Sequence, residues 1–394
     1  MYRVIEWILR IKGYPRNVAV SVLATSLVVV NQALLSMPLP LVLELQGIKE
    51  HTGVVMAVFA VAAVIGSFLA GTQSILFGAR STGLLGLVLM GVGSIGYAFD
   101  SLTVLIIARV IQGYAFGLSL AAIGMLQWVG VSKPEQGRAT AAVSAANAFS
   151  WFAGPISFWL ISELTNVVAD NRLVYSVWVA VGLMTMLLAI RILLSLESRP
   201  KQSKVHARTV REWVAKNIHG PSYATSLLNV GMVVFYWQYM SYMPMYSSYG
   251  KDIIFLTVAL SVIAALVTGR FADSRHLILL SRVTMVLSVF FVIHGEFWSL
   301  VVAAILMSFG YRANWNGTVQ KMQSQLPEHL KANATSAWQT SLNIGNAIGF
   351  WIGGSVGSAT NYTSQMWWFA LPFVVCSALV ALPWKNCSIR RRPR

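Results

Sequence analysis

Long apolar segments separated by short polar ones run along the whole chain. Each segment holds about twenty or more mostly apolar residues, the length that an α-helix needs to cross the hydrocarbon core of a bilayer. A helix also satisfies its own backbone hydrogen bonds there, without water. The pattern therefore predicts twelve transmembrane helices, at 18–43, 52–73, 83–99, 102–128, 139–162, 173–194, 222–247, 253–272, 277–294, 298–320, 332–357 and 364–384.

The longest polar stretch, 195–221, divides these spans into two sets of six. It is rich in Lys, Arg and Ser, and its apolar residues recur at helical spacing, as do those before the first span. Both patterns are typical of amphipathic helices that lie on a membrane surface. The predicted organisation is an N-terminal interfacial segment (1–17), an N-terminal six-helix bundle (18–194), a basic linker (195–221), a C-terminal six-helix bundle (222–384) and a basic tail (385–394).

Short sequence repeats relate the two halves. Pro134-Glu135 recurs as Pro327-Glu328, and Ala139-Thr140 recurs as Ala334-Thr335, so the fifth and eleventh spans begin alike. Parallel repeats of this kind place a binding site near the middle of the membrane, between two halves that rock against each other. The sequence therefore predicts an all-α integral membrane protein with two pseudo-symmetric bundles.

Composition and charge exclude a soluble protein. Of the 394 residues, 56% are hydrophobic and 11% are charged, and the mean hydropathy is +0.65. A net charge of +16 would favour nucleic acid in a soluble chain, but here the Lys and Arg residues gather in alternate loops. Outside the spans, Lys49, Arg172 and Lys251 alone would face the side opposite to the termini. This bias matches the positive-inside rule.

The charge bias predicts a multi-pass protein of a bacterial inner membrane with both termini in the cytoplasm. Anionic membrane lipids are the expected partners of the basic loops, and no nucleic acid partner is expected. Cys376 and Cys387 are the only cysteines, and the histidines show no metal-ligand spacing. No disulfide, metal site or cofactor is therefore predicted, and we expect a monomer.

Several motifs resemble those of one transporter family. In the fourth span, Arg109, Gln112 and Gly113 form the pattern Arg-x-x-Gln-Gly, which resembles a signature of the major facilitator superfamily. Residues 269–275 are similar to the second copy of that family's Gly-x-x-x-Asp loop, and Gly154-Pro155 resembles the core of its antiporter motif. The resemblance implies the twelve-helix fold of bacterial efflux-type members, with Gly113, Gly154 and Pro155 serving helix packing and the antiporter-like motif.

Two arginines within spans are the main candidates for a solute site. A guanidinium inside a bilayer costs on the order of several kcal/mol unless it faces protein or water. We expect Arg109 to meet Asn31 and Gln32, because the resemblance brings spans one and four together beside a cavity. The alternatives are a structural role for Arg109, and an interfacial belt or helix packing for the tyrosines. The predicted substrate-binding residues are Asn31, Gln32, Arg109, Gln112, Tyr236, Gln238, Tyr239, Arg312 and Asn316.

Acidic residues are absent from the middle of the predicted spans. All thirteen lie at span ends or in loops. A cavity with arginines, amides and tyrosines but no buried acid favours an anionic or zwitterionic solute. If protons drive transport, which the resemblance permits, Glu44 at the outer end of the first span is the candidate carrier. An ordinary glutamate at a loop edge also explains Glu44.

The loop after the eighth span predicts a conformational lock. A carboxylate there can cap a facing helix and pair with an arginine of the other half. The predicted lock residues on the cytoplasmic side are Gly269, Arg270, Asp273 and Arg138. Ile75 occupies the matching acidic position in the first half, so we expect a one-sided lock and a shifted balance between states.

These features predict a secondary transporter, working as an exporter, that moves a small anionic or zwitterionic organic solute by alternating access. Protons are the candidate coupling ion. Two alternatives stay open: a multidrug efflux pump for lipophilic neutral or cationic compounds, and a membrane sensor or lipid-flipping factor that does not transport. An enzyme is not expected, because the sequence offers no convincing nucleophile, metal cluster or phosphate loop, and no catalytic residue is predicted.

Overall fold

The computed structural model describes residues 16–99, 101–127, 131, 136–167, 171–196, 228–236, 239–240, 249–271, 275–325, 328–356 and 362–381. The interfacial segment, the basic linker and the basic tail predicted from sequence lie outside these residues except at their edges, as does much of the seventh span. The described residues form helices joined by short connections and contain no strand. The predicted all-α architecture is confirmed for this part of the chain.

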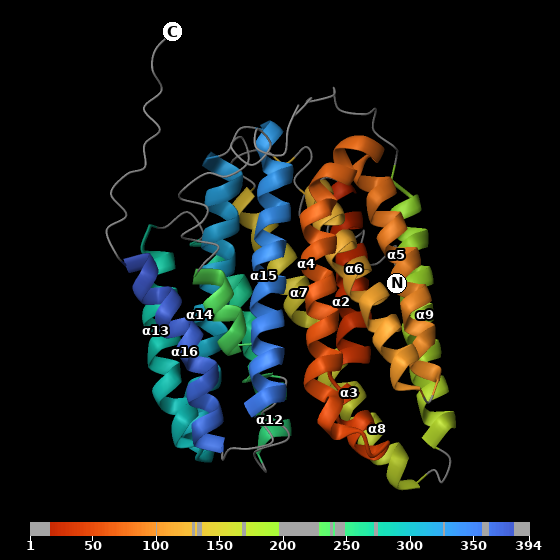
Figure 1. Cartoon of the computed structure of the whole chain (residues 1–394). Coiled ribbons are helices and arrows are strands. Elements are labelled where there is room, and N and C mark those ends of the chain that lie inside the picture. Colours follow the sequence, from red (N-terminus) through yellow and green to blue (C-terminus); the bar gives the residue numbers. More distant parts are fainter. Residues whose placement is uncertain are drawn as a thin grey trace.

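The helices fall into two groups that lie side by side (Figure 1). The first contains α2 (Arg16–Ser36), α3 (Leu39–Leu45), α4 (Thr52–Phe77), α5 (Ala79–Ile95), α6 (Leu102–Gln127), α7 (Gln136–Ser150), α8 (Ala153–Val167) and α9 (Asn171–Leu194), with 3-10 turns η1 (Lys49–His51) and η2 (Gly96–Ala98). The second contains α12 (Gly250–Gly269), α13 (Arg275–His294), α14 (Phe297–Gln325), α15 (Glu328–Val356) and α16 (Tyr362–Ala381). Residues 228–236 and 239–240 are also helical.

Most helices run along the long axis of the molecule, and sharp turns join neighbours. The turn from α4 to α5 is made at Gly78, whose φ of 88° is a conformation that residues with a Cβ rarely adopt. We call the end that holds this turn, together with Arg80 and Arg270, the basic end. The opposite end, which holds α3 and the last turn of α8, is called the far end (Figure 1).

Two predicted spans are each built from two helices. The span 18–43 breaks between α2 and α3, and the span 139–162 breaks between α7 and α8. A proline ring clashes with the carbonyl four residues earlier. Pro40 therefore accounts for the end of α2 at Ser36, and Pro155 for the interruption at Trp151.

The outer surface of the bundle is apolar. Within the described residues, seven helical segments are long and apolar enough to cross a bilayer. Large exposed apolar side chains follow one another at helical spacing on α5 (Leu85, Val88, Val92) and on α13 (Val283, Leu287). Apolar faces of this extent do not remain bare in water, whereas hydrocarbon covers them without cost. The chain is a multi-pass membrane protein.

Glycines bring α4 and α6 into backbone contact. A Cβ on Gly113 would lie 2.1 Å from the carbonyl oxygen of Phe59, and one on Gly117 would lie 2.1 Å from that of Ala63. Any side chain at either position would push the two helices apart. This close approach fixes the neighbouring turn of α6, which carries Arg109, against the first turns of α4.

Candidate functional site

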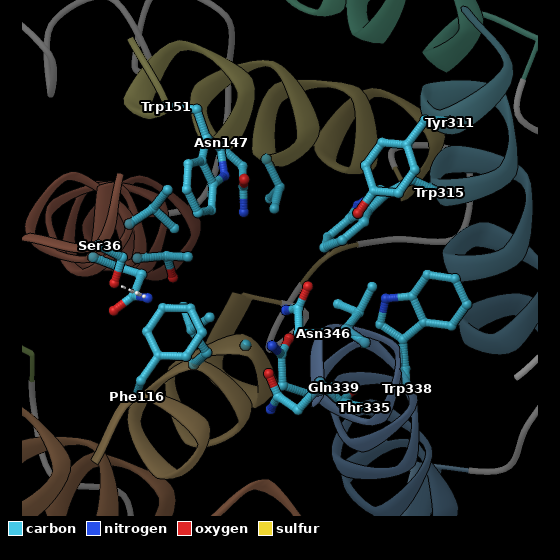
Figure 2. A pocket seen from close by; sticks show the side chains of 18 of the residues that line it. Ser36, Phe116, Asn147, Trp151, Tyr311, Trp315, Thr335, Trp338, Gln339 and Asn346 are labelled. Carbon is cyan, nitrogen blue, oxygen red and sulfur yellow. Dashed lines mark hydrogen bonds between the residues drawn. The ribbon is translucent and has the colours of Figure 1, made fainter. Parts of the chain in front are cut away.

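A cavity lies between the two halves, near the middle of the bundle. About 130 Å³ of it is open to molecules the size of water. Helices α2, α4, α6 and α7 line it from the first half, and α14 and α15 line it from the second. Figure 2 shows side chains from both halves turned towards this space.

The cavity wall combines aromatic rings with uncharged polar groups. The rings are those of Phe59, Phe116, Trp151, Tyr311, Trp315, Trp338 and Phe350. The amides are Gln32, Gln127, Asn147, Gln339, Asn343 and Asn346, and the aliphatic hydroxyls are Thr25, Ser36 and Thr335. Among the described residues, no ionised side chain lines the cavity. Such a wall can stack against a flat or apolar face and hydrogen-bond polar atoms.

Arg109 lies one layer behind this wall and is fully buried. Its Nη1 donates hydrogen bonds to the hydroxyls of Ser36 (2.8 Å) and Tyr97 (2.7 Å). A weaker bond reaches the Oε1 of Gln112 at 3.3 Å, and that oxygen also accepts a bond from the Tyr97 hydroxyl. The guanidinium stacks 4.2 Å from the ring centroid of Phe59, which itself lines the cavity. The charge is therefore beside the cavity without being exposed to it.

Ser36 connects Arg109 to the cavity. Its hydroxyl oxygen accepts hydrogen bonds from Arg109 Nη1 and from Nε2 of Gln32, the latter at 2.6 Å. These two donors occupy the two lone pairs of the oxygen, so the hydroxyl hydrogen remains for donation to another group. Ser36 lines the cavity and can offer this hydrogen, polarised by the guanidinium behind it, to a solute.

Arg312 occupies a comparable position in the second half. Its side chain is 2% exposed, and its Nη1 donates to the carbonyl oxygen of Ser144 on α7 at 3.4 Å, across the boundary between the halves. Its Nε has no hydrogen-bond partner among the described residues. Its guanidinium lies 5.4 Å from the ring centroid of Tyr311, which lines the cavity. No described carboxylate pairs with either arginine.

Of the residues predicted to bind substrate, Gln32 is the only described one that lines the cavity. The expected contact between Asn31 and Arg109 is wrong, because Asn31 donates to the carbonyl oxygen of Gly182 on α9 at 2.8 Å. Asn316 likewise turns to α12, where it donates to the hydroxyl of Thr268 at 2.8 Å. Both asparagines tie helices together within one half.

The predicted tyrosines lie in the packed second half. The ring of Tyr236 is parallel to that of Tyr311 at a centroid distance of 4.3 Å, and its hydroxyl is 2.7 Å from the Oγ of Ser261. Tyr239 is fully buried, and Gln238 lies outside the described residues. Tyr236 thus supports Tyr311 from behind, on the side away from the cavity.

The predicted carrier and lock residues are placed at the two ends. Glu44 is exposed in the last turn of α3, at the far end. Gly269 ends α12 at the basic end, where an added Cβ would lie 2.1 Å from the Cβ of Ala141 on α7, and Arg270 beside it is exposed. Asp273 and the side chain of Arg138 lie outside the described residues, so their predicted pairing stays a prediction.

Contacts between the two halves extend from the middle of the bundle to the basic end. The hydroxyl of Ser336 on α15 donates to the carbonyl oxygen of Ser67 on α4. Asn343 donates to the carbonyl oxygen of Ala63 at 3.1 Å and to the Ser67 hydroxyl at 3.2 Å. These contacts close the described part of the basic end with small uncharged groups. We call them, together with the contact between Gly269 and α7, the basic-end closure.

A second crevice opens between the halves at the far end. It lies between α8 and α12, and Met37 lines both this crevice and the central cavity. Met37 follows the last residue of α2, and a Cβ on Gly154 would lie 2.4 Å from its sulfur. The thioether therefore separates the cavity from the far-end crevice.

The sequence reasoning missed the cavity residues of α15. Thr335, Gln339, Asn343 and Asn346 recur every three or four residues within a predicted span. A polar stripe at this spacing in a membrane helix faces protein or water. The tryptophans of the cavity carried no such signal, because an indole in a span can equally face lipid.

Comparison with known proteins places this architecture among transporters. The family model of the Major Facilitator Superfamily matches residues 21–273 and 252–393. The fold is similar to that of the E. coli fucose:proton symporter FucP, at 14% identity and a TM-score of 0.72, over 92% of this chain and 97% of that one. No sequence among curated proteins matches the chain significantly.

Two further solved structures share the fold. The proton:xylose symporter XylE matches at 13% identity and a TM-score of 0.70, over 92% of this chain and 94% of that one. The human organic anion transporter MFSD10 matches at 17% identity and a TM-score of 0.65, over 92% of this chain and 100% of that one. At these identities the likeness concerns the fold alone.

Proposed function

This chain belongs to the Major Facilitator Superfamily, a family of transporters, and we propose that it exports a small anionic or zwitterionic organic solute. The halves 18–194 and 222–384 would rock about the central cavity and expose it to one side of the membrane at a time. The single observation that carries the choice of solute is the pair of buried guanidiniums behind the cavity wall, which no described carboxylate balances.

The Coulomb attraction of each buried arginine is large enough to select an anion over a neutral solute. Two unit charges about 8 Å apart interact with about 2 kcal/mol at an effective dielectric constant of about 20. Each arginine would then favour a bound anion about 30-fold over a neutral analogue and disfavour a cation by the same factor. Desolvation of the anion opposes this gain, and the amide and hydroxyl groups of the wall offset part of that cost. A lipophilic cation is repelled by both guanidiniums, and the aromatic rings of the wall offset only part of that repulsion through cation–π attraction.

A second candidate is a neutral, hydroxyl-rich solute. It is favoured by the absence of ionised side chains from the described cavity wall. FucP and XylE, which share the fold, are sugar symporters. MFSD10, which also shares it, is an organic anion transporter, so the fold accommodates either class.

Counterflow in proteoliposomes tests the proposal. A carboxylate, its primary amide and the corresponding amine share one skeleton and differ in charge. We expect the carboxylate to exchange best and the amine at least tenfold less well, because both buried arginines repel it. Preference for the amine would replace the proposal with cation efflux, and preference for the amide would favour the neutral solute. Binding without exchange would indicate a sensor.

The orientation follows from charge. We propose that the basic end faces the cytoplasm of a bacterial inner membrane, where its cations meet anionic lipids, and that both termini lie on that side. Export is supported by the resemblance of Gly154-Pro155 to the antiporter motif. We propose a monomer, with no enzymatic activity and no cofactor.

We propose that protons drive transport through Glu44. This carboxylate lies at the exposed end of α3, directly after the helix that carries Gln32 and Ser36. We expect Glu44→Gln to abolish accumulation driven by a pH gradient but to retain solute counterflow, because exchange needs no net proton movement. Glu163→Gln, at an exposed acid of the same end, is the matched control. Unchanged accumulation in Glu44→Gln would remove Glu44 from the coupling.

A further inference from the structure

Three tryptophans from three separate places in the fold line the central cavity. Trp151 comes from the break between α7 and α8 in the first half, Trp315 from α14 and Trp338 from α15 in the second. Figure 2 shows Trp151 on one side of the cavity and Trp315 and Trp338 on another. The cavity is therefore bounded by indole rings that belong to different halves.

The indole of Trp338 has an unmet hydrogen-bonding capacity. Its side chain is 4% exposed, and its Nε1 has no hydrogen-bond partner among the described residues. Figure 2 shows this nitrogen on the edge of the ring that faces the cavity. An indole N–H is a donor only, and buried donors are nearly always paired. The partner of this one is to be sought in the cavity.

The ring of Trp338 is held in place by its neighbours. Trp315 meets it edge to face, at a centroid distance of 5.8 Å and an interplanar angle of 81°. Tyr311 packs against Trp315 in turn, at 6.3 Å, and is stacked on Tyr236. This aromatic row is fixed by packing, so the donor of Trp338 and the rings around it form a preorganised surface.

A donor of a different kind lies at another corner of the cavity. Ser36, backed by Arg109, can offer its hydroxyl hydrogen there (Figure 2). Groups on opposite sides of the cavity are thus suited to two different parts of one molecule. The arginine-backed hydroxyl suits a negative group, and the indole donor with its surrounding rings suits a flat ring that carries a hydrogen-bond acceptor.

We propose that the solute is a heteroaryl carboxylate, an inference that rests on the proposed transport of an anion. Its ring lies between Trp151 and the pair Trp315 and Trp338, a ring nitrogen or oxygen accepts from Trp338 Nε1, and its carboxylate lies near Ser36. The ring contacts both halves, so the solute itself completes the contact between them when the cavity closes around it.

Three acids of similar size test the inference on the unchanged protein. Pyridine-3-carboxylate has a flat ring and an acceptor, benzoate has the ring alone, and cyclohexanecarboxylate has neither. Dissociation constants are measured with the purified full-length protein in detergent, and counterflow with labelled pyridine-3-carboxylate in liposomes. We expect affinity to fall about tenfold at each step of this series, first for the lost hydrogen bond and then for the lost stacking.

Substitutions test which residue causes the loss of affinity between pyridine-3-carboxylate and benzoate. Trp338→Phe keeps a ring but removes the donor, so it is expected to lower the affinity for pyridine-3-carboxylate about tenfold and to leave benzoate unchanged. Trp351→Phe is the matched control on the same helix, because Trp351 is 66% exposed on the outer surface. Should Trp338→Phe fail to fold, the series on the unchanged protein still decides.

The outcomes distinguish a failure of the heteroaryl assignment from a failure of the proposed anion transport. Equal affinity for benzoate and cyclohexanecarboxylate would overturn the ring assignment and leave anion transport standing. Equal affinity for pyridine-3-carboxylate and benzoate would overturn the role of Trp338 Nε1. Binding of none of the three acids, together with binding of neutral or cationic analogues of the same skeletons, would overturn the proposed function as well.

Discussion

Replacing Arg109 with glutamine is expected to lower the affinity for an anionic solute about 30-fold and to leave the affinity for its neutral amide within a few fold. The side chain does not line the cavity, so it acts on the solute through its charge and through Ser36. Loss of about 2 kcal/mol of Coulomb attraction gives this factor. Binding of the acid and of its amide to the purified variant provides the measurement.

Two further variants separate charge from architecture. Arg109→Lys keeps the positive charge but loses the planar guanidinium that stacks on Phe59 and donates through Nε to the carbonyl oxygen of Val55, so it should retain most of the preference for the acid. Arg80→Gln removes a cation at the basic end, where Arg80 bonds the carbonyl oxygens of Leu193 and Leu194, and should not alter solute preference. Equal losses for acid and amide in Arg109→Gln would mean that Arg109 only supports the fold.

Replacing Gly269 with valine is expected to shift the protein towards a state that is open at the basic end. A Cβ at this position would lie 2.1 Å from the Cβ of Ala141 and 2.8 Å from its Cα, so α12 and α7 must move apart. Overpacking of this kind costs about 1–3 kcal/mol, which corresponds to roughly a 5- to 150-fold change in the balance of states. Spin labels at Phe77 on α4 and Leu279 on α13, both exposed, would report a longer distance.

Substitutions at Gly91 and Ala141 provide the controls for the Gly269→Val variant. A Cβ on Gly91 of α5 would meet Met186 at 3.8 Å, an ordinary contact, so Gly91→Ala should leave the label distance unchanged. Adding Ala141→Gly to Gly269→Val removes the shorter of the two clashes and should restore part of the closed population. An unchanged distance in Gly269→Val alone would show that this contact does not control the basic end.

Most of the fold could be predicted because hydrocarbon imposes one simple requirement on sequence. A span must be long, apolar and helical, and the described helices follow the predicted ranges closely. The breaks at Met37 and Trp151 were also present in the sequence, as prolines three or four residues later. Each break can be located from the carbonyl that lies four residues before the proline, because the proline ring clashes with it.

The site was harder to predict because each helical residue turns the side chain by about 100°. Asn31 and Gln32 are neighbours in sequence, yet one bonds α9 and the other lines the cavity. The arginines were visible because a charge in a span is rare, but nothing in the sequence showed that Ser36 would lie between Arg109 and the cavity. The depth of the Arg109 side chain behind the cavity wall depends on how closely α4 and α6 approach at Gly113 and Gly117.

The basic-end closure bears on how this membrane protein would respond to the salinity of its surroundings. Within the described residues it consists of hydroxyls, an amide, backbone carbonyls and the apolar contact between Gly269 and Ala141, with no ion pair between the halves. Dissolved ions weaken exposed pairs of opposite charge within about 10 Å at 0.1 M salt but have little effect on contacts between uncharged dipoles. The contacts of the described part of the basic-end closure should therefore form and break equally readily at low and at high salt concentration.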